Sequence, residues 1–194
     1  MEPSALRGRR FRRVRARIST VVDVLILCTG NAARSVMAAT SLAARRPDLR
    51  VRTAGTLVVD GQPMSIRTRA AIEGVGLEVP RHASRQVHPP DLDEATLVMA
   101  LAPEHVEWVR RTHAPAAERT VTLRRLVEHL PEAPTLAEQV AALAPHTVEL
   151  EPWEEVVDPG GGEADVFAAC AREIDRLVHA LAPRLAAPAR LRHA

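Results

Sequence analysis

The sequence predicts a single-domain α/β protein, built as a doubly wound sheet of about four parallel strands flanked by helices. Short apolar segments alternate with helical ones, which is the pattern of a parallel sheet with crossover helices. The first apolar segment, residues 21–27, has the near-continuous hydrophobicity of a strand covered on both faces. At 194 residues the chain can bury a substantial core without disulfides.

The first strand and the segment after it predict an anion site. Residues 21–27 (VVDVLIL) form the strand, Cys28 lies at its end, and a helix is expected from Arg34 onward. A loop that leads into a helix N-terminus turns several backbone N–H groups toward one point, and the helix dipole adds partial positive charge there. A thiolate at Cys28 is expected to be stabilised by the same donors.

The side chains of this loop suit the same purpose. Arg34 can direct two N–H donors at an oxyanion. Gly30 allows positive φ, Asn31 can pin a tight loop, and Ser35 can cap the helix or donate to the sulfur of Cys28. The alternative is a core cysteine that ends a strand, with Arg34 in solvent. The strand before the loop and the helix after it favour the anion site.

The next elements follow the same alternation. Residues 50–56 (RVRTAGT) predict a second strand, and residues 83–87 a short, weaker one. Between them we expect a helix that Pro63 opens and that Gly74 and Gly76 close. The residues expected on its buried side are Ile66, Ala70 and Ile72.

The second half of the chain predicts two further strands. Residues 97–101 (LVMAL) form the third, followed by a helix over 103–111, and residues 120–123 form the fourth. The segment 124–152 is expected to be partly helical, with a surface helix over 136–143, and contains no recognisable motif.

A second stretch with chemical potential precedes the last helix. In residues 153–163 (WEEVVDPGGGE), Asp158 is a candidate general acid, although an ordinary Asp-Pro-Gly turn is the alternative. The last helix is expected over residues 165–181, where Cys170 lies on the apolar stripe and is interpreted as a packing residue. The stripe consists of Val166, Phe167, Cys170, Ile174, Leu177, Val178 and Leu181.

The two ends of the chain differ from its centre. Residues 1–20 predict a disordered basic arm, residues 21–183 the folded domain and residues 184–194 a tail. The arm could contact nucleic acid, anionic lipid or an acidic partner, but a solvated extension is favoured. We expect no secretory signal and no membrane span, and two cysteines without regular spacing suggest a reducing cytoplasm.

From about Val21 to Leu181 the chain resembles the low-molecular-weight protein tyrosine phosphatases. Four segments carry the resemblance in the correct order: CTGNAARS, VRTAGT followed by GQP, RHASRQV, and VVDPGGGEADVF. The resemblance implies a cysteine-dependent phosphomonoester hydrolase. Cys28 would attack phosphorus to form a phosphocysteine intermediate, Arg34 would bind the equatorial oxygens, and Asp158 would protonate the leaving group and later activate water.

The resemblance also implies a supporting network and no metal or organic cofactor. Asn31 and Ser35 would hold the loop and the thiolate, and Thr53 and His82 would join their hydrogen bonds. Thr53 replaces the serine usual in the family. The residues expected to bind phosphate are Thr29, Gly30, Asn31, Ala32, Ala33, Arg34 and Ser35.

Departures from the family concern the substrate. Ala33 replaces a frequent second cysteine, and Gly160 and Gly161 stand where the family usually has tyrosines, while Thr29 and Ala32 offer little to hold a ring. We therefore expect a phosphorylated protein or small phosphomonoester as substrate, but not necessarily phosphotyrosine. The alternatives are an arsenate reductase that uses an external low-molecular-weight thiol and a non-catalytic module that binds phosphate or a phosphoprotein.

Overall fold

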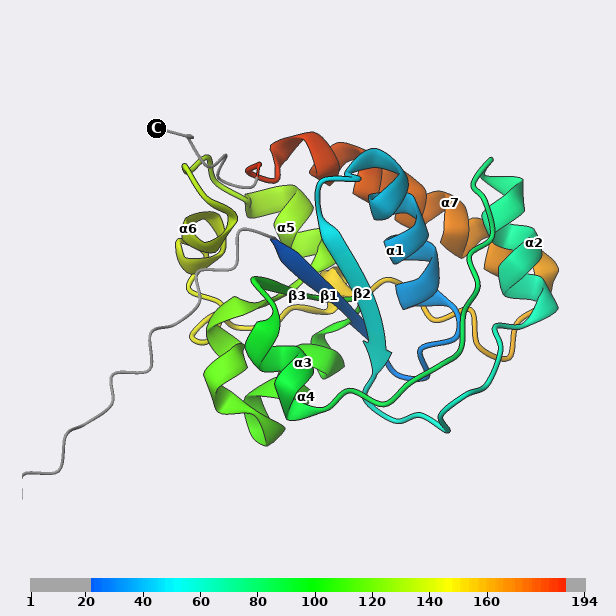
Figure 1. The fold of residues 1–194 in the computed structure, drawn as a ribbon, viewed down its shortest axis with the longest axis horizontal. Coiled ribbons are helices and arrows are strands. Elements are labelled where there is room, and N and C mark those ends of the chain that lie inside the picture. Colours follow the sequence, from blue (N-terminus) through cyan, green and yellow to red (C-terminus); the bar gives the residue numbers. More distant parts are fainter. Residues whose placement is uncertain (1–21, 188–194) are drawn as a thin grey trace, which may run out of the picture.

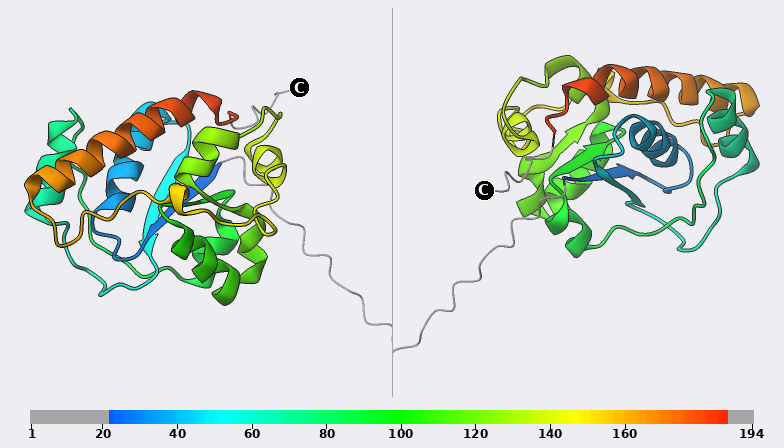
Figure 2. Two further views of the ribbon diagram at one scale, coloured as in Figure 1. Left: turned by 180° about the vertical axis from the view of Figure 1, so that it is seen from behind. Right: turned by 45° about the horizontal axis from the view of Figure 1, so that its top comes forward.

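The computed structural model describes residues 22–187 and confirms the predicted doubly wound α/β fold. Its four strands are all parallel, in the order β2-β1-β3-β4, with helices on both faces (Figures 1 and 2). The predicted basic arm lies outside the described residues. The strands are β1 (Asp23–Cys28), β2 (Arg50–Gly55), β3 (Leu97–Ala100) and β4 (Thr120–Thr122).

Seven α-helices and three short 3₁₀ helices connect and cover the strands within the described residues. The α-helices are α1 (Arg34–Arg45), α2 (Ile66–Gly74), α3 (Pro89–Glu94), α4 (Pro103–Thr112), α5 (Leu123–His129), α6 (Leu136–Ala141) and α7 (Ala164–Leu181). The 3₁₀ helices are η1 (Ala114–Arg119), η2 (Pro152–Glu154) and η3 (Ala182–Arg184). The sequence did not predict the short helices α3 and α5.

The alternation of side chains along β1 separates two hydrophobic cores. Val24, Ile26 and Cys28 belong to the larger core beneath α1, α5 and α7, whereas Leu25 and Leu27 belong to a smaller one beneath α3, α4 and η1. Successive side chains of a strand point to opposite faces. Cys28 is thereby placed on the face that α1 covers, next to the loop between β1 and α1.

The expected buried side of α2 is partly wrong. Ile72 is buried as predicted, but Ile66 is 81% exposed and Ala70 is exposed, whereas Thr68 and Ala71 are buried. The reason is that Ser65 caps α2 by accepting a hydrogen bond from the backbone N–H of Thr68. This cap starts α2 at Ile66 and leaves that first residue facing solvent.

Three smaller expectations also need correction. Val166 is more exposed than the rest of the α7 stripe and packs over Gly162 in the preceding loop. The short strand over 83–87 is a single bridge between Gly55 and Gln86. The predicted domain boundary at residue 183 is too early, because Leu185 is buried and the backbone N–H of Ala186 donates to Gln139.

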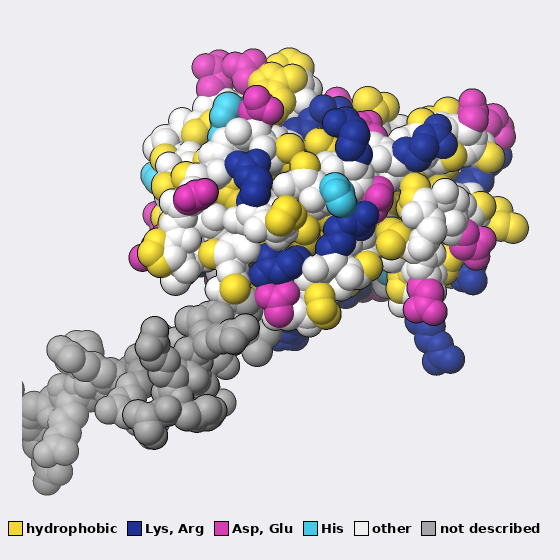
Figure 3. Space-filling view, turned by 90° about the horizontal axis from the view of Figure 1, so that it is seen from above, with side chains coloured by type: hydrophobic (Ala, Val, Ile, Leu, Met, Phe, Trp, Pro, Cys, Tyr) yellow, Lys and Arg dark blue, Asp and Glu magenta, His cyan; other side chains and the backbone are white. Residues whose placement is uncertain are grey.

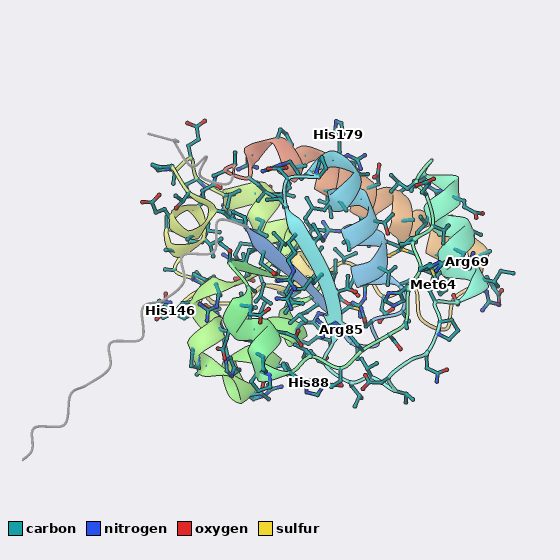
Figure 4. All side chains as sticks on the ribbon, in the orientation of Figure 1. Met64, Arg69, Arg85, His88, His146 and His179 are labelled. Carbon is teal, nitrogen blue, oxygen red and sulfur yellow. The ribbon has the colours of Figure 1, made fainter. Side chains whose placement is uncertain are left out.

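Asp23, the polar residue inside the first apolar run, begins a chain of ion pairs. Its buried carboxylate accepts from Arg52, which also donates to Asp91 at 2.9 Å, and Asp91 pairs with Arg85 at 2.9 Å. Burial alone would raise the pKa of Asp91, but hydrogen bonds from Arg85 and the His88 backbone, with the charges of Arg85 and Arg52, lower it. The chain fixes Arg85 beside the carboxyl end of β2 (Figure 4).

Glu154 anchors the segment before residue 158 in a similar way. Its fully buried carboxylate accepts from Arg125 at 2.5 Å, from the hydroxyl of Thr122 at 2.5 Å and from the backbone of Glu151 at 2.9 Å. Burial would raise the pKa of Glu154, but these hydrogen bonds outweigh it and lower the pKa.

We expect Glu154→Gln to reduce the free energy of unfolding at pH 7 by about 3–5 kcal/mol, because it leaves Arg125 without its buried counter-charge. A lowered folded-state pKa stabilises fully above the unfolded value of about 4.3, and the stabilisation is lost as pH falls through the folded value. Urea titrations at pH 7 and at low pH should therefore show the difference from wild type shrinking in acid. Glu155→Gln, at the exposed neighbouring position, is the matched control and should change little. A loss that is unchanged in acid would contradict this account.

The surface carries charges of both signs. Viewed from the side of α1 and α7, acidic and basic side chains are interspersed with uncharged ones (Figure 3). None of the helices within residues 22–187 has the length and apolar character required to cross a membrane.

Candidate active site

The loop between β1 and α1 closes tightly over the end of the sheet. Its left-handed residue is Asn31, with φ of 48°, a conformation that asparagine tolerates, whereas Gly30 has no positive φ. The backbone N–H of Thr56 donates to the carbonyl of Cys28, which ties the loop to the chain after β2. Gly55 is a residue that sequence reasoning missed: a Cβ there would lie 2.4 Å from the carbonyl oxygen of Thr29. No side chain can be added at this position without moving the loop.

Hydrogen bonds aim the hydroxyl of Ser35 at the sulfur of Cys28. The amide of Asn31 donates to Ser35 Oγ at 3.0 Å, and Ser35 Oγ lies 3.0 Å from Cys28 Sγ. Because the amide fills one acceptor position of the hydroxyl, the Ser35 proton is free to be donated to the sulfur. The N-cap residue of α1 is Ala33, which has no polar side chain to cap the first helical turn. Those N–H groups are therefore available to an anion.

Asn31 is held from behind by the segment that contains His82 and Arg85. The backbone N–H of Arg85 donates to Asn31 Oδ1 at 3.0 Å, and His82 Nε2 donates to the Asn31 carbonyl at 2.6 Å. Thr53 is not brought into this network among the described residues: its carbonyl accepts from Arg85 Nε, and its hydroxyl makes no hydrogen bond to the loop. Arg85, which the sequence did not single out, occupies that supporting position.

Arg34 and Asp158 meet although 124 residues separate them. Arg34 is 3% exposed, and its Nη2 lies 2.5 Å from Asp158 Oδ2, while its Nη1 donates to the carbonyl of Val156 at 3.2 Å. The carboxylate of Asp158 is half-exposed and also accepts from the backbone N–H of Gly160 at 2.9 Å. The predicted acidic loop is thus placed directly against the predicted anion loop.

These side chains surround one small cavity of about 280 Å³. The lining residues that the sequence predicted come from the loop between β1 and α1 and from the loop before α7. Ser65, Thr68 and Phe167 also line the cavity, although the sequence did not suggest them. The hydroxyl of Thr68 donates to the carbonyl of Ala32 at 3.1 Å and so fixes the mouth of the loop. The full lining is Cys28, Gly30, Ala32, Ala33, Arg34, Ser65, Thr68, Asp158, Gly160 and Phe167. A larger cavity of about 760 Å³ lies beside η3 and contains none of these residues.

The second cysteine belongs to the packing of this site. Cys170 is buried in α7 with its sulfur 3.7 Å from the carbonyl of Val157, and burial raises its pKa to about 12. A thiol of this kind stays protonated at neutral pH and is a poor nucleophile. Among residues 22–187 no group of three His, Cys, Asp or Glu side chains is arranged to hold a metal ion.

The site places a strand-ending cysteine, a loop with free backbone N–H groups, an arginine and an aspartate around one cavity. Known proteins are similar to this chain over most of its length. A family model described as low molecular weight phosphotyrosine protein phosphatase matches residues 23–191. The chain belongs to this family.

The names of two similar proteins indicate different substrates. A protein-arginine-phosphatase of Geobacillus stearothermophilus is 27% identical over 163 residues, which cover 84% of this chain and 95% of that protein. A low-molecular-weight protein-tyrosine-phosphatase, Ptp of Acinetobacter johnsonii, is 24% identical over 52% of this chain and 71% of that protein.

Solved structures agree with the family assignment. The YwlE arginine phosphatase from G. stearothermophilus superposes with a TM-score of 0.68 at 26% identity, covering 84% of this chain and 91% of that one. A low-molecular-weight protein tyrosine phosphatase from T. tengcongensis gives a TM-score of 0.68 at 24% identity, covering 84% and 99%, and shows the shared fold.

Proposed function

We propose that this phosphatase removes phosphate from a phosphorylated protein side chain, with Cys28 as nucleophile, Arg34 as oxyanion ligand and Asp158 as general acid and base. The observation that supports this most directly is the contact of Arg34 with Asp158 at 2.5 Å across the cavity that Cys28 lines. This cavity thus brings a candidate nucleophile, a buried cation and a carboxylate together.

The first chemical step would use the loop as it stands. The thiolate of Cys28 attacks phosphorus, and the bond between phosphorus and the leaving atom breaks in line with the new P–S bond. The backbone N–H groups of the loop and the guanidinium of Arg34 bind the equatorial oxygens, where preorganised donors stabilise the transition state strongly. Asp158 transfers its proton to the departing oxygen or nitrogen.

The second step would release the phosphate from Cys28. Asp158, now a carboxylate, takes a proton from a water molecule that attacks phosphorus, and the P–S bond breaks. Ser35 donates its hydrogen bond to the sulfur at 3.0 Å and stabilises the thiolate as it leaves. The cycle ends with inorganic phosphate, Cys28 as thiolate and Asp158 protonated. Once phosphate leaves, Asp158 can release that proton and return to its ion pair with Arg34.

The surroundings of the cavity favour phosphoarginine over phosphotyrosine as substrate. Stacking a phenyl ring needs flat apolar neighbours. Phe167 is the one aromatic side chain in the cavity lining, where Ala32 and Gly160 are small, and the ring of Trp153 is covered by Arg125. A departing guanidine that takes the proton of Asp158 becomes a cation beside a carboxylate, which is a favourable pair. The similarity to a protein-arginine-phosphatase supports the same choice.

Two other reaction classes are less well supported. Arsenate reduction would have to use an external low-molecular-weight thiol, because the buried Cys170, with its pKa raised to about 12, is a poor partner for an internal thiol relay. A non-catalytic binding module would have no need for Asp158 against Arg34. Both alternatives are outcomes of the experiment that follows.

The test compares hydrolysis of three substrates: an aryl phosphate, a phosphotyrosine peptide and a phosphoarginine peptide of the same sequence. We expect Cys28-dependent turnover of the aryl phosphate and a higher kcat/KM for phosphoarginine than for phosphotyrosine. A preference for phosphotyrosine would overturn the substrate assignment alone. Absence of turnover with all three by a folded protein would overturn the phosphatase proposal.

The role of Asp158 makes a separate prediction about leaving groups. We expect Asp158→Asn to lower kcat by about 10²–10⁴ for an alkyl phosphate, whose leaving group needs a proton, and much less for a nitrophenyl phosphate. The measurement is a series of aryl and alkyl phosphates plotted against leaving-group basicity, with wild type beside the variant. Glu163→Gln, in the same loop but 81% exposed at its side chain, is the control. Equal losses across the series would remove Asp158 from the role of acid.

A further inference from the structure

A polar cluster formed by Thr29, Glu104 and His105 contacts Arg34 outside the catalytic set described above. The hydroxyl oxygen of Thr29 lies 3.1 Å from His105 Nε2 and 3.2 Å from Glu104 Oε1. The same oxygen accepts a hydrogen bond from Arg34 Nη2 at 3.4 Å. The reaction as proposed uses the backbone of Thr29 but none of these three side chains.

The protonation of His105 follows from its surroundings. The ring is 1% exposed, and burial, followed by the positive charge of Arg34, lowers its pKa to about 3 against an opposing effect of Asp158. The ring is therefore neutral at pH 7 and carries one proton. Nε2 lies 3.2 Å from a Glu104 carboxylate oxygen, which can only accept, whereas Nδ1 has no partner among residues 22–187. The proton belongs on Nε2.

This assignment fixes the direction of every hydrogen bond in the cluster. His105 Nε2–H donates to the hydroxyl oxygen of Thr29, and the hydroxyl proton of Thr29 is donated to Glu104. Both lone pairs of the Thr29 oxygen are then occupied, one by His105 and one by Arg34. A hydroxyl with all its hydrogen bonds made has one orientation, and it presents an acceptor to the guanidinium.

The same backbone segment restrains Arg34 from a second side. His105 lies in the first turn of α4, just after Leu101 at the end of β3. The carbonyl of Leu101 accepts from the backbone N–H of Val156, and the carbonyl of Val156 accepts from Arg34 Nη1. The segment from Leu101 to His105 thus positions one acceptor for each terminal nitrogen of the guanidinium.

We propose that His105, acting through Thr29, is a positioning residue that holds the guanidinium of Arg34 in the plane needed to bind phosphate. A phosphate in the loop competes with Asp158 for Arg34 Nη2, so the uncharged contacts to Thr29 and Val156 are those that can restrain the guanidinium both before and after binding. This inference rests on the proposed function only in taking phosphate as the bound anion.

The test uses four variants and two measurements. His105→Leu removes the donor, His105→Gln places an amide N–H near the position of Nε2, Thr29→Val removes the hydroxyl, and the double variant combines the first and third. Glu107→Ala, exposed on the same helix, is the control. The measurements are the affinity for inorganic phosphate by calorimetry and the kcat and KM for an aryl phosphate, on variants whose thermal unfolding is recorded.

We expect His105→Leu and Thr29→Val each to weaken phosphate binding about tenfold, the scale of one hydrogen bond to a charged group. The phosphate affinity of His105→Gln should stay within about threefold of wild type. The double variant should bind phosphate no more weakly than the single variant with the lower affinity, because both changes break the same chain of contacts. Glu107→Ala should leave both quantities unchanged.

Losses that multiply in the double variant, or wild-type phosphate affinity in Thr29→Val, would overturn the proposal. So would a His105→Leu protein that loses thermal stability but binds phosphate normally, since that would make the ring a packing residue. Thr29 is only half-buried, so its variant should fold even where His105→Leu does not. Absence of turnover in wild type would count against the phosphatase proposal, whereas the binding data would still decide the role of His105.

Discussion

Cys28→Ser is expected to lower turnover of every substrate by roughly 10⁴-fold or more, because it removes the thiolate that we propose as the nucleophile. A serine hydroxyl is far less ionised than a thiol at neutral pH and is a much poorer nucleophile and leaving group. The variant should still bind phosphate, since the loop amides, Arg34 and the hydrogen bond from Asn31 to Ser35 remain. Activity is measured on an aryl phosphate and phosphate affinity by calorimetry.

The matched control is Cys170→Ala, which removes the other thiol from the same chain. Its sulfur makes one weak contact, to the carbonyl of Val157, so the variant should keep most of the turnover with a modest loss of stability. Comparable losses in both variants would mean that neither thiol is a nucleophile. Retained turnover in Cys28→Ser would move the covalent step away from the loop altogether.

Arg34→Lys is expected to have the second-largest effect, a loss in kcat/KM of about 10³-fold, equivalent to about 4 kcal/mol. The guanidinium reaches Val156, Thr29 and Asp158 at once, and a single ammonium cannot reproduce that planar geometry. Phosphate binding should weaken along with turnover, in contrast to Cys28→Ser.

The control for the arginine variant lies on the same helix. Arg45, at the far end of α1, pairs with Asp175 at 2.8 Å, and a lysine there can keep that ion pair. Arg45→Lys should therefore leave kcat/KM within about twofold of wild type. If Arg34→Lys behaves like Arg45→Lys, the anion is held by the loop amides alone and the arginine is not required.

Much of the fold and the anion loop could be predicted because local signals specify them. The apolar run of β1 and the Ser-containing helix start after it place Cys28, Arg34 and Ser35 on adjacent elements of one βα unit. Asp158 was predicted as a general acid as well, but only the family resemblance favoured that role over an ordinary Asp-Pro-Gly turn. Its contact with Arg34 depends on α7 and the segment before it returning across the sheet, which no local pattern encodes.

The parts that were missed depend on tertiary contacts. Gly55 looks like an ordinary turn residue, and only its distance to Thr29 explains why a side chain is excluded. Arg85 contacts Asn31 through its backbone N–H, a group that every residue but proline has, so the sequence gives no signal for it. His105 could have been noticed as a histidine following the third strand, but its burial and its bond to Thr29 could not.

The ion pair between Arg34 and Asp158 has a consequence for which solutes can compete for this site. The carboxylate of Asp158 lies 2.5 Å from the guanidinium of Arg34. Any anion that binds Arg34 must therefore compete with a carboxylate of the same chain, whose local concentration is high. Chloride or a small carboxylate brings one charge and few acceptors and gains little by the exchange. A tetrahedral dianion engages the loop amides as well as Arg34 and can displace Asp158. We therefore expect the pair to favour tetrahedral dianions over abundant monovalent salts at this site.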